Sequence, residues 1–208
     1  WSTLVYSPIT HWVWASNGWL FELGALDFAG GTVIHINAGI AAVAASLIVG
    51  KRRNPGLQPN NVPYVILGAA ILWFGWFGFN AGSALSAGDS AANAFLVTSL
   101  AASTAALTWG VISHLKTGKM GAVGVATGAV AGLVAITPAA GAVNAMGSLA
   151  IGFGAGLICF YAVELLHKTN MDDALDVFAV HGIGGIWGAI ATGIFALEAI
   201  SGTQGLIE

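Results

Sequence analysis

The sequence predicts an all-α membrane protein, a polytopic bundle of about six membrane-spanning helices. Of its 208 residues, 57% are hydrophobic and only 7% are charged, and the mean hydropathy is +0.83. A soluble domain carries about 25% charged residues, so this chain has too few polar side chains to cover a water-facing surface. Thirty glycines favour the same fold class, because small residues let membrane helices approach one another closely.

Six apolar segments are each long enough to cross a bilayer, which takes roughly 20 apolar residues. They run approximately over 25–49, 62–86, 92–114, 121–140, 144–167 and 174–198, and polar, charged or proline-containing stretches separate them. Continuous apolar runs of this length favour helices over barrel strands. We treat residues 1–208 as a single transmembrane domain, and a chain that opens on Trp1 suggests a piece of a longer protein.

The basic residues predict how the spans are oriented. All lysines and arginines follow the first, third or fifth span: Lys51, Arg52, Arg53, Lys116, Lys119 and Lys168. Loops rich in lysine and arginine stay on the cytoplasmic side of a membrane. We therefore expect a multi-pass protein of the cell membrane with these loops in the cytoplasm, and with residues 1–24 and 199–208 outside.

Two histidines lie within apolar spans, and each follows an aspartate by the same number of residues. His35 follows Asp27 in the first span, and His181 follows Asp173 in the sixth. An ionisable residue inside a membrane span marks a functional site by default. Because the two spans run in opposite directions, they resemble the halves of an inverted repeat, whose shared site lies at the midplane. The alternative for each histidine is a single hydrogen bond to a neighbouring helix.

The aspartates also have a plain structural interpretation. Asp27 precedes the first span, and Asp173 and Asp176 precede the sixth. A carboxylate at a helix N-terminus accepts hydrogen bonds from the free backbone N–H groups there. Such capping is compatible with a functional role, because a fixed charge at the end of a pore also shapes the local potential.

A third pattern lies in "WFGWFGFNAGSA", residues 73–84. Trp76, Phe79 and Ser83 share one face of a helix, since they are separated by three and four residues. They could form an aromatic packing face or part of an interfacial tryptophan belt. An aromatic face that ends in a hydroxyl could instead guide a small cation by cation–π attraction.

Three motifs in this order resemble the signatures of the ammonium transporter family, which includes the methylammonium permeases and the Rh proteins. They are "DFAGGTVIHINAGIAA", "WFGWFGFNAGSA" and "DDALDVFAVHGIGGIWG". The resemblance covers essentially the whole chain. It implies a trimeric inverted-repeat fold of eleven helices with a pore in each protomer, of which this chain matches the fifth to tenth helices.

The resemblance also implies roles for individual residues. His35 and His181 match twin histidines that line a hydrophobic pore. Trp14, Ser83 and Asp27 match an outer recruitment site, Phe79 matches a gate phenylalanine, and Trp76 matches the tryptophan below it. The implied function is to recruit NH4+ outside, remove a proton and pass NH3 through the pore. The implied partners are the lipid bilayer, two further copies in a homotrimer, and a cytoplasmic regulatory protein or fused signalling domain.

Two other classes remain open at this stage. The same bundle could be an ammonium sensor coupled to a signalling domain outside this chain. Less favoured is a b-type cytochrome subunit, with His35 and His181 as axial haem ligands. The sequence contains no evident phosphate-binding loop, metal-ligand cluster or nucleophile triad. We therefore expect no enzyme activity, no metal, no cofactor and no nucleic acid partner.

Overall fold

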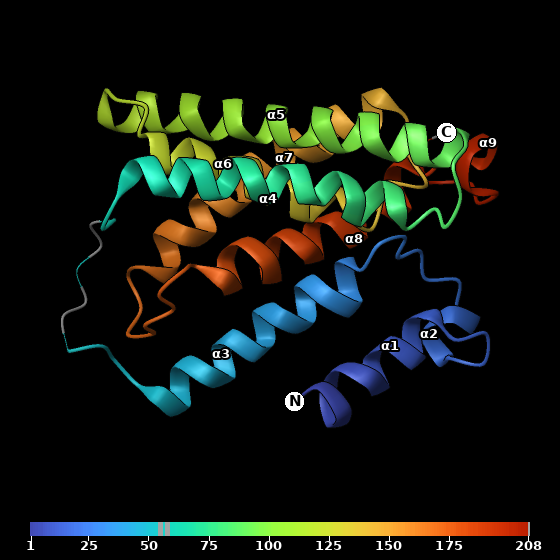
Figure 1. The fold of residues 1–208 in the computed structure, drawn as a ribbon, viewed down its shortest axis with the longest axis horizontal. Helices are drawn as coiled ribbons and strands as arrows, with labels where there is room; N and C mark the ends of the chain where they lie inside the picture. The colour runs from blue at the N-terminus through green and yellow to red at the C-terminus, as the bar shows by residue number, and fades with distance from the viewer. Residues whose placement is uncertain (54–55, 57–58, 208) are drawn as a thin grey trace.

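A computed structural model describes residues 1–53, 56 and 59–207 of this chain, so Glu208 and part of the first basic loop lie outside the described residues. Among these residues every regular element is helical, and three of the elements are π-helical turns, labelled η (Figure 1). In chain order they are η1 (Ser2–Tyr6), α1 (Ser7–Trp14), α2 (Trp19–Glu22), η2 (Gly31–Ile36), α3 (Asn37–Val49), α4 (Val62–Gly82), α5 (Asp89–Thr117), α6 (Ala122–Ile136), α7 (Ala145–Leu166), η3 (Phe178–Ile183), α8 (Gly184–Phe195) and α9 (Glu198–Ser201).

The predicted all-α polytopic fold is confirmed. Among the described residues, five continuous helices are long and apolar enough to cross a membrane: Gly31–Val49, Val62–Gly82, Asp89–Thr117, Ala145–Leu166 and Phe178–Phe195. The apolar segment expected at 121–140 contains a shorter helix, α6, of 15 residues. The first and sixth helices begin at Gly31 and Phe178, several residues after the starts that the sequence suggests, because Asp27 and Asp173 belong to the turns before them.

Helices α5, α6 and α7 form the tightest part of the bundle, and small residues make this packing possible. A Cβ atom added to Gly132 on α6, or to Gly152 on α7, would collide with the backbone carbonyl oxygen of Ala101 on α5. Two glycine faces therefore meet the same turn of α5. In a membrane protein such close backbone approach replaces the hydrophobic driving force as the source of helix association.

The η2–α3 and η3–α8 helices run in opposite directions past one another (Figure 1). Each begins with a π-helical turn that carries one of the two histidines, η2 with His35 and η3 with His181. They approach closely at Gly39 and Gly182, where a Cβ on Gly39 would collide with the backbone of Gly182. π-Helical turns are rare and concentrate at functional sites, so this shared irregularity marks the two histidines as a matched pair.

The segment after α6 was expected to be a short turn between spans, and the structure places it deep inside the protein. Residues 137–143 form a turn that is almost entirely buried. The N–H of Phe28 donates to the carbonyl of Pro138 at 3.1 Å, and the N–H of Ala29 donates to the carbonyl of Thr137 at 3.2 Å. Irregular backbone is tolerated in a membrane protein where other parts of the protein satisfy its polar groups.

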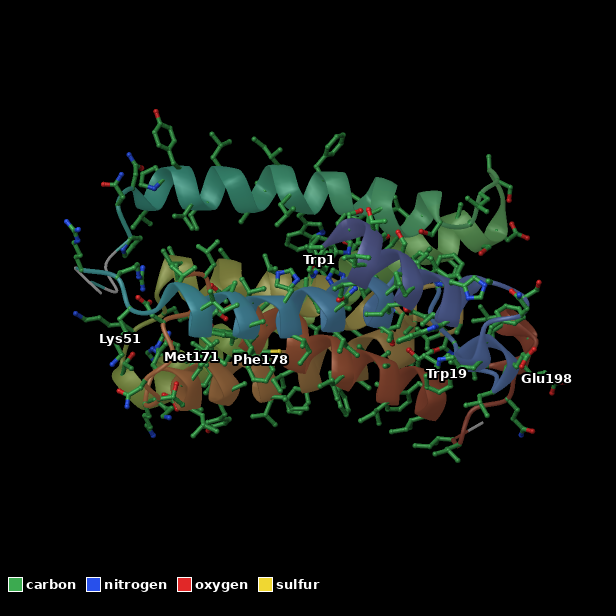
Figure 2. The ribbon with its side chains drawn as sticks, turned by 90° about the horizontal axis from the view of Figure 1, so that it is seen from below. Trp1, Trp19, Lys51, Met171, Phe178 and Glu198 are labelled. Atoms are coloured by element: carbon green, nitrogen blue, oxygen red, sulfur yellow. The ribbon has the colours of Figure 1, made fainter. Side chains whose placement is uncertain are left out.

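The bundle has two distinct ends. Lys51 and Met171 lie at one end and Trp19 and Glu198 at the other (Figure 2). The long helices alternate in direction, so the loops after α3, α5 and α7 share the end of Lys51 (Figure 1). These loops contain every lysine and arginine of the chain except Lys116, which lies in the last turn of α5. We call this end the basic end of the bundle.

Candidate functional site

The two histidines meet inside the bundle, as their matched positions predict. The Nδ1 atoms of His35 and His181 lie 3.2 Å apart, within hydrogen-bonding distance, and their ring centroids are 5.3 Å apart. The side chain of His35 is only 3% exposed, and that of His181 is half-buried. Since one proton must lie between two Nδ1 atoms that share a hydrogen bond, the pair holds its rings in a fixed relation.

Asp27 fixes the turn that presents His35. Its two carboxylate oxygens accept hydrogen bonds from four consecutive backbone N–H groups, those of residues 30–33, which begin η2. Gly30 has φ +117°, a conformation that side chains rarely adopt, and it bends the backbone so that these four donors converge. The expected capping role of Asp27 is therefore confirmed, and its carboxylate is 8% exposed behind the histidine helix.

Only one of the two aspartates before the sixth span caps it with its side chain. Asp173 accepts a hydrogen bond from the N–H of Phe178, the first residue of η3, at 2.7 Å. The cap expected from the side chain of Asp176 is wrong, since Asp176 pairs with Nε2 of His167 at 2.8 Å. Asp176 adopts a left-handed backbone, with φ +53°, which turns its carboxylate toward α7. Asp27 and Asp173 thus occupy equivalent places before the two histidine turns.

Aromatic rings of α4 cover His35. The ring of Trp76 stacks on His35 with centroids 5.1 Å apart and planes inclined by 17°. Phe79 meets His35 edge-on at 5.9 Å and Trp76 at 5.5 Å. The predicted face of α4 therefore turns toward the histidine pair. These rings surround the imidazole with apolar surface, so an intact ion would find few compensating polar groups here.

The two remaining candidates of the outer site are held by backbone groups. The indole Nε1 of Trp14 donates to the backbone carbonyl of Asp27 at 2.7 Å, and the indole is 39% exposed. The hydroxyl of Ser83, directly after α4, donates to the carbonyl of Phe79 at 2.8 Å. That bond uses the only hydroxyl proton of Ser83, so its oxygen offers lone pairs to any further partner.

Sequence reasoning missed one residue of this site, Thr137. Its side chain is fully buried, and its hydroxyl oxygen lies 2.9 Å from Nε1 of Trp76 and 3.3 Å from Nε2 of His35. The available signal was a threonine before Pro138 at the end of an apolar run, which is also an ordinary turn sequence. Only the fold brings this turn beside the histidine pair.

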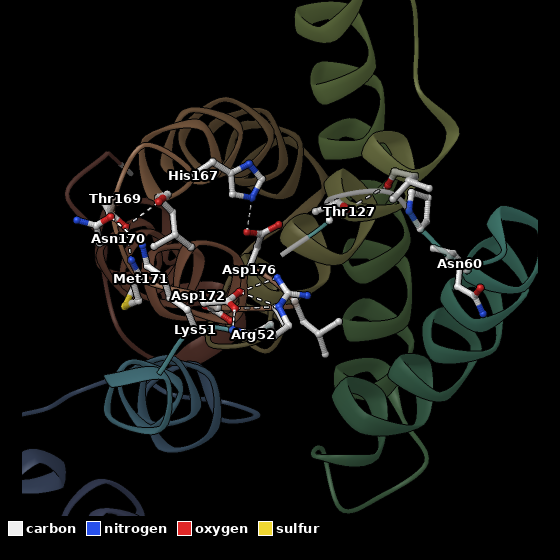
Figure 3. Close-up of a pocket in the computed structure, with 18 of the residues that line it drawn as sticks. Lys51, Arg52, Asn60, Thr127, His167, Thr169, Asn170, Met171, Asp172 and Asp176 are labelled. Atoms are coloured by element: carbon white, nitrogen blue, oxygen red, sulfur yellow. Dashed lines mark hydrogen bonds and ion pairs between the residues drawn. The ribbon is translucent and has the colours of Figure 1, made fainter. Parts of the chain in front are cut away.

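Two hollows lie between His181 and the basic end. A small one of about 140 Å3 is lined by His181 together with Val130 and Val180. A larger one of about 860 Å3 lies among the loops of the basic end (Figure 3). Val65, Thr127 and Leu175 line both hollows, so the two are neighbours. His181 therefore borders a small hollow, lined mostly by apolar side chains, that adjoins the larger cavity of the basic end.

Charged side chains surround the larger cavity. Arg52 pairs with Asp172 at 2.6 Å (Figure 3), and this guanidinium holds the pKa of the Asp172 carboxyl below its usual range. Burial raises the pKa of Asp176, and its pairing with His167 opposes that rise. The larger cavity is therefore strongly polar, in contrast to the mostly apolar side chains beside His181.

A comparison with known protein families shows to which family this chain belongs. Residues 1–207 match the model described as "Ammonium Transporter Family". The chain belongs to the ammonium transporter family. An ammonium transporter of Aquifex aeolicus is 57% identical over 208 residues, which is all of this chain and 49% of that protein. The family assignment implied by the three sequence motifs is confirmed, and the chain is a multi-pass membrane protein.

Solved structures agree with this family. The crystal structure of Saccharomyces cerevisiae Mep2 matches with a TM-score of 0.91 and 43% identity, over 96% of this chain and 46% of that chain. A structure named "Sensor Amt Protein" matches with a TM-score of 0.86 and 37% identity, over 95% of this chain and 52% of that chain. This ammonium transporter family chain thus spans about half the length of the relatives that it matches.

The geometry of the histidines argues against a haem site. Axial ligands must lie on opposite faces of the macrocycle with the iron between them. Here the two Nδ1 atoms are 3.2 Å apart and bonded to each other, and the ring of Trp76 covers His35. This arrangement leaves no place for a haem between the two imidazoles.

Proposed function

We propose that the protein containing this chain moves ammonium across the cell membrane by recruiting NH4+ on one side, removing a proton and passing NH3 along the histidine pair. The observation that carries this proposal is the buried pair His35–His181, joined at 3.2 Å between Nδ1 atoms. Histidine suits this chemistry because its ring nitrogens both accept and donate hydrogen bonds near neutral pH. Ammonium can shed its charge before an apolar section, whereas potassium cannot.

Recruitment takes place at Trp14 and Ser83, with Asp27 behind them. A cation over the exposed indole of Trp14 gains about 2 kcal/mol when desolvated. The hydroxyl of Ser83 donates to Phe79, so its lone pairs accept an N–H of the incoming ammonium. The carboxylate of Asp27 holds the turn below Trp14 and adds a negative charge that does not contact the substrate.

The rings of Phe79 and Trp76 form the inner gate, and the histidines follow it. Trp76 stacks on His35, which supports a passage too apolar for an ion that keeps its charge. Moving an unpaired ion into such surroundings costs several kcal/mol or more. Ammonia then reaches His181, continues into the small cavity and is protonated again in the larger, charged cavity.

The direction of this path follows from the charges. The basic end faces the cytoplasm, because loops rich in lysine and arginine are retained there, and residues 1–24 and 199–208 lie outside. The 860 Å3 cavity is then the cytoplasmic vestibule. A homotrimer and a cytoplasmic regulatory protein complete the proposal, as the family resemblance implies for the whole protein.

A growth assay tests whether the protein carries ammonium. In cells that lack their own ammonium transporters, the complete gene should restore growth on low ammonium in acidic medium, where little free ammonia is present. Replacing His181 with alanine should reduce growth to that of the empty vector. His114→Ala, which changes an exposed histidine of α5, is the matched control and should grow normally. If cells that carry the wild-type gene grow no better than cells with the empty vector, the transport function is contradicted.

The second candidate is an ammonium sensor, which the similarity to the structure named "Sensor Amt Protein" favours. A sensor needs to bind ammonium but has no need for flux. The same assay separates the two, because binding without flux does not restore growth. Rescue by the wild-type gene therefore favours a transporter. Specific ammonium binding by a protein that fails to rescue growth favours a sensor.

A further inference from the structure

We propose that Thr137 is a positioning residue that fixes which nitrogens of the histidine pair carry protons. The two imidazoles alone cannot determine which ring donates, because a hydrogen bond between two Nδ1 atoms can form with the proton on either ring. A third group must distinguish them. Thr137 contacts His35 at Nε2, on the opposite side of the ring from His181.

The hydroxyl proton of Thr137 is already committed. It points to the carbonyl of Leu133 at 2.7 Å, compared with 3.3 Å to His35. In a regular helix the N–H of residue 137 would donate to the carbonyl of Leu133, but here it donates to the carbonyl of Val134 at 3.2 Å. The residue that follows, Pro138, has no N–H. The carbonyl of Leu133 is therefore left to the hydroxyl.

The other two contacts of the hydroxyl must then be acceptor contacts. Nε1 of Trp76 can only donate, and it lies 2.9 Å from the threonine oxygen. The remaining lone pair faces Nε2 of His35, so this nitrogen must carry a hydrogen. A neutral imidazole has one N–H, which leaves Nδ1 of His35 bare. The proton in the 3.2 Å bond between the rings consequently belongs to His181.

The hydrogen bonds of the cluster therefore all point in one direction. His181 donates from Nδ1 to His35, and His35 donates from Nε2 to Thr137. The one ring nitrogen left with a free lone pair is Nε2 of His181, whose side chain lines the small cavity toward the basic end. His35 has no lone pair free for a further donor, since Nδ1 accepts from His181 and Nε2 carries a hydrogen.

The consequence for transport rests on the proposed function. Ammonium has only N–H donors, so it finds no acceptor on His35 and is not bound by this ring. Ammonia can donate to Nε2 of His181 and move on. Without the hydroxyl of Thr137, either tautomer becomes available, and His35 can take up a proton in the outward-facing position.

Nitrogen-15 NMR of the complete protein, labelled at histidine and reconstituted in lipid, tests the assignment directly. The wild type should show His35 protonated at Nε2 and His181 at Nδ1. The opposite assignment in the wild type would overturn the proposal, whatever the variants do. This spectrum requires no transport, so a protein that shows the expected tautomers but carries no ammonium would overturn the proposed function alone.

Variants test whether Thr137 is the cause. Thr137→Val should replace the single set of His35 signals with a mixture of tautomers, and Thr137→Ser, which keeps the hydroxyl, should restore the single set. Thr192→Val is the matched control, because Thr192 is also fully buried and bonds the carbonyl four residues earlier, that of Gly188, at 2.7 Å. A folded Thr137→Val protein with unchanged His35 and His181 signals would refute the role of Thr137.

Discussion

Replacing His35 with aspartate should let potassium through the pathway that we propose for ammonium. The wild-type ring is enclosed by Trp76, Phe79 and His181, so a smaller side chain opens space for water. The carboxylate also adds a negative charge deep in the membrane, which lowers the barrier for any small cation. Because each ~1.4 kcal/mol removed from a barrier gives a tenfold faster rate, we expect potassium current to rise by about tenfold or more.

The measurement is potassium-driven current at fixed voltage, with the complete protein reconstituted in liposomes. His35→Asn separates charge from space, since asparagine has nearly the size of aspartate without its charge. It should conduct far less potassium than His35→Asp. His114→Asp adds the same charge at an exposed position and should leave the current unchanged. If His35→Asp still carries ammonium and its potassium current stays at the wild-type level, selectivity must lie elsewhere, at Trp14, Phe79 and Ser83.

Asp27→Asn should lower ammonium uptake by at least about tenfold, and Asp27→Ala should abolish it. The carboxylate serves four backbone donors, whereas a carboxamide has one acceptor oxygen and turns an NH2 group toward the others. Each buried donor left without a partner costs about 1–3 kcal/mol. The turn that presents His35 therefore loosens, and the charge behind the recruitment site is lost.

Uptake of labelled ammonium by the reconstituted protein measures this effect. Asp89→Asn is the matched control, because Asp89 also begins a helix, α5, but is exposed. It should transport normally. An Asp27→Asn protein with full uptake would contradict this account, because transport would then need neither the charge of Asp27 nor its full set of four hydrogen bonds.

The long spans could be predicted because the membrane imposes a simple rule on length and hydropathy. The two histidines could be predicted to meet, since matched spacings in oppositely directed helices leave few other arrangements. The π-helical turns that carry them could not be predicted, because no local pattern in η2 or η3 distinguishes a π-helical turn from an ordinary α-helix. The two turns lie where Gly39 packs against Gly182 and where Asp27 and Asp173 bind the first N–H groups of the helices.

Two features could not be predicted from the sequence because they depend on contacts that have no local pattern. The partner of Asp176 is His167, in the turn that ends α7, and a separation of nine residues has no helical or turn signature. Thr137 lies about one hundred residues from His35 in the chain, inside a segment that looked like a loop between spans. Its burial follows from backbone bonds to the turn after Asp27, which no local pattern encodes.

The most direct test of the account is the uptake of nitrogen-15 ammonium by liposomes that contain the purified complete protein, measured with potassium in large molar excess outside. The account predicts saturable ammonium uptake that potassium leaves unchanged, because potassium cannot shed its charge before the apolar section around His35 and His181. Uptake no greater than in empty liposomes, or uptake that falls in proportion to added potassium while potassium itself enters, would contradict it.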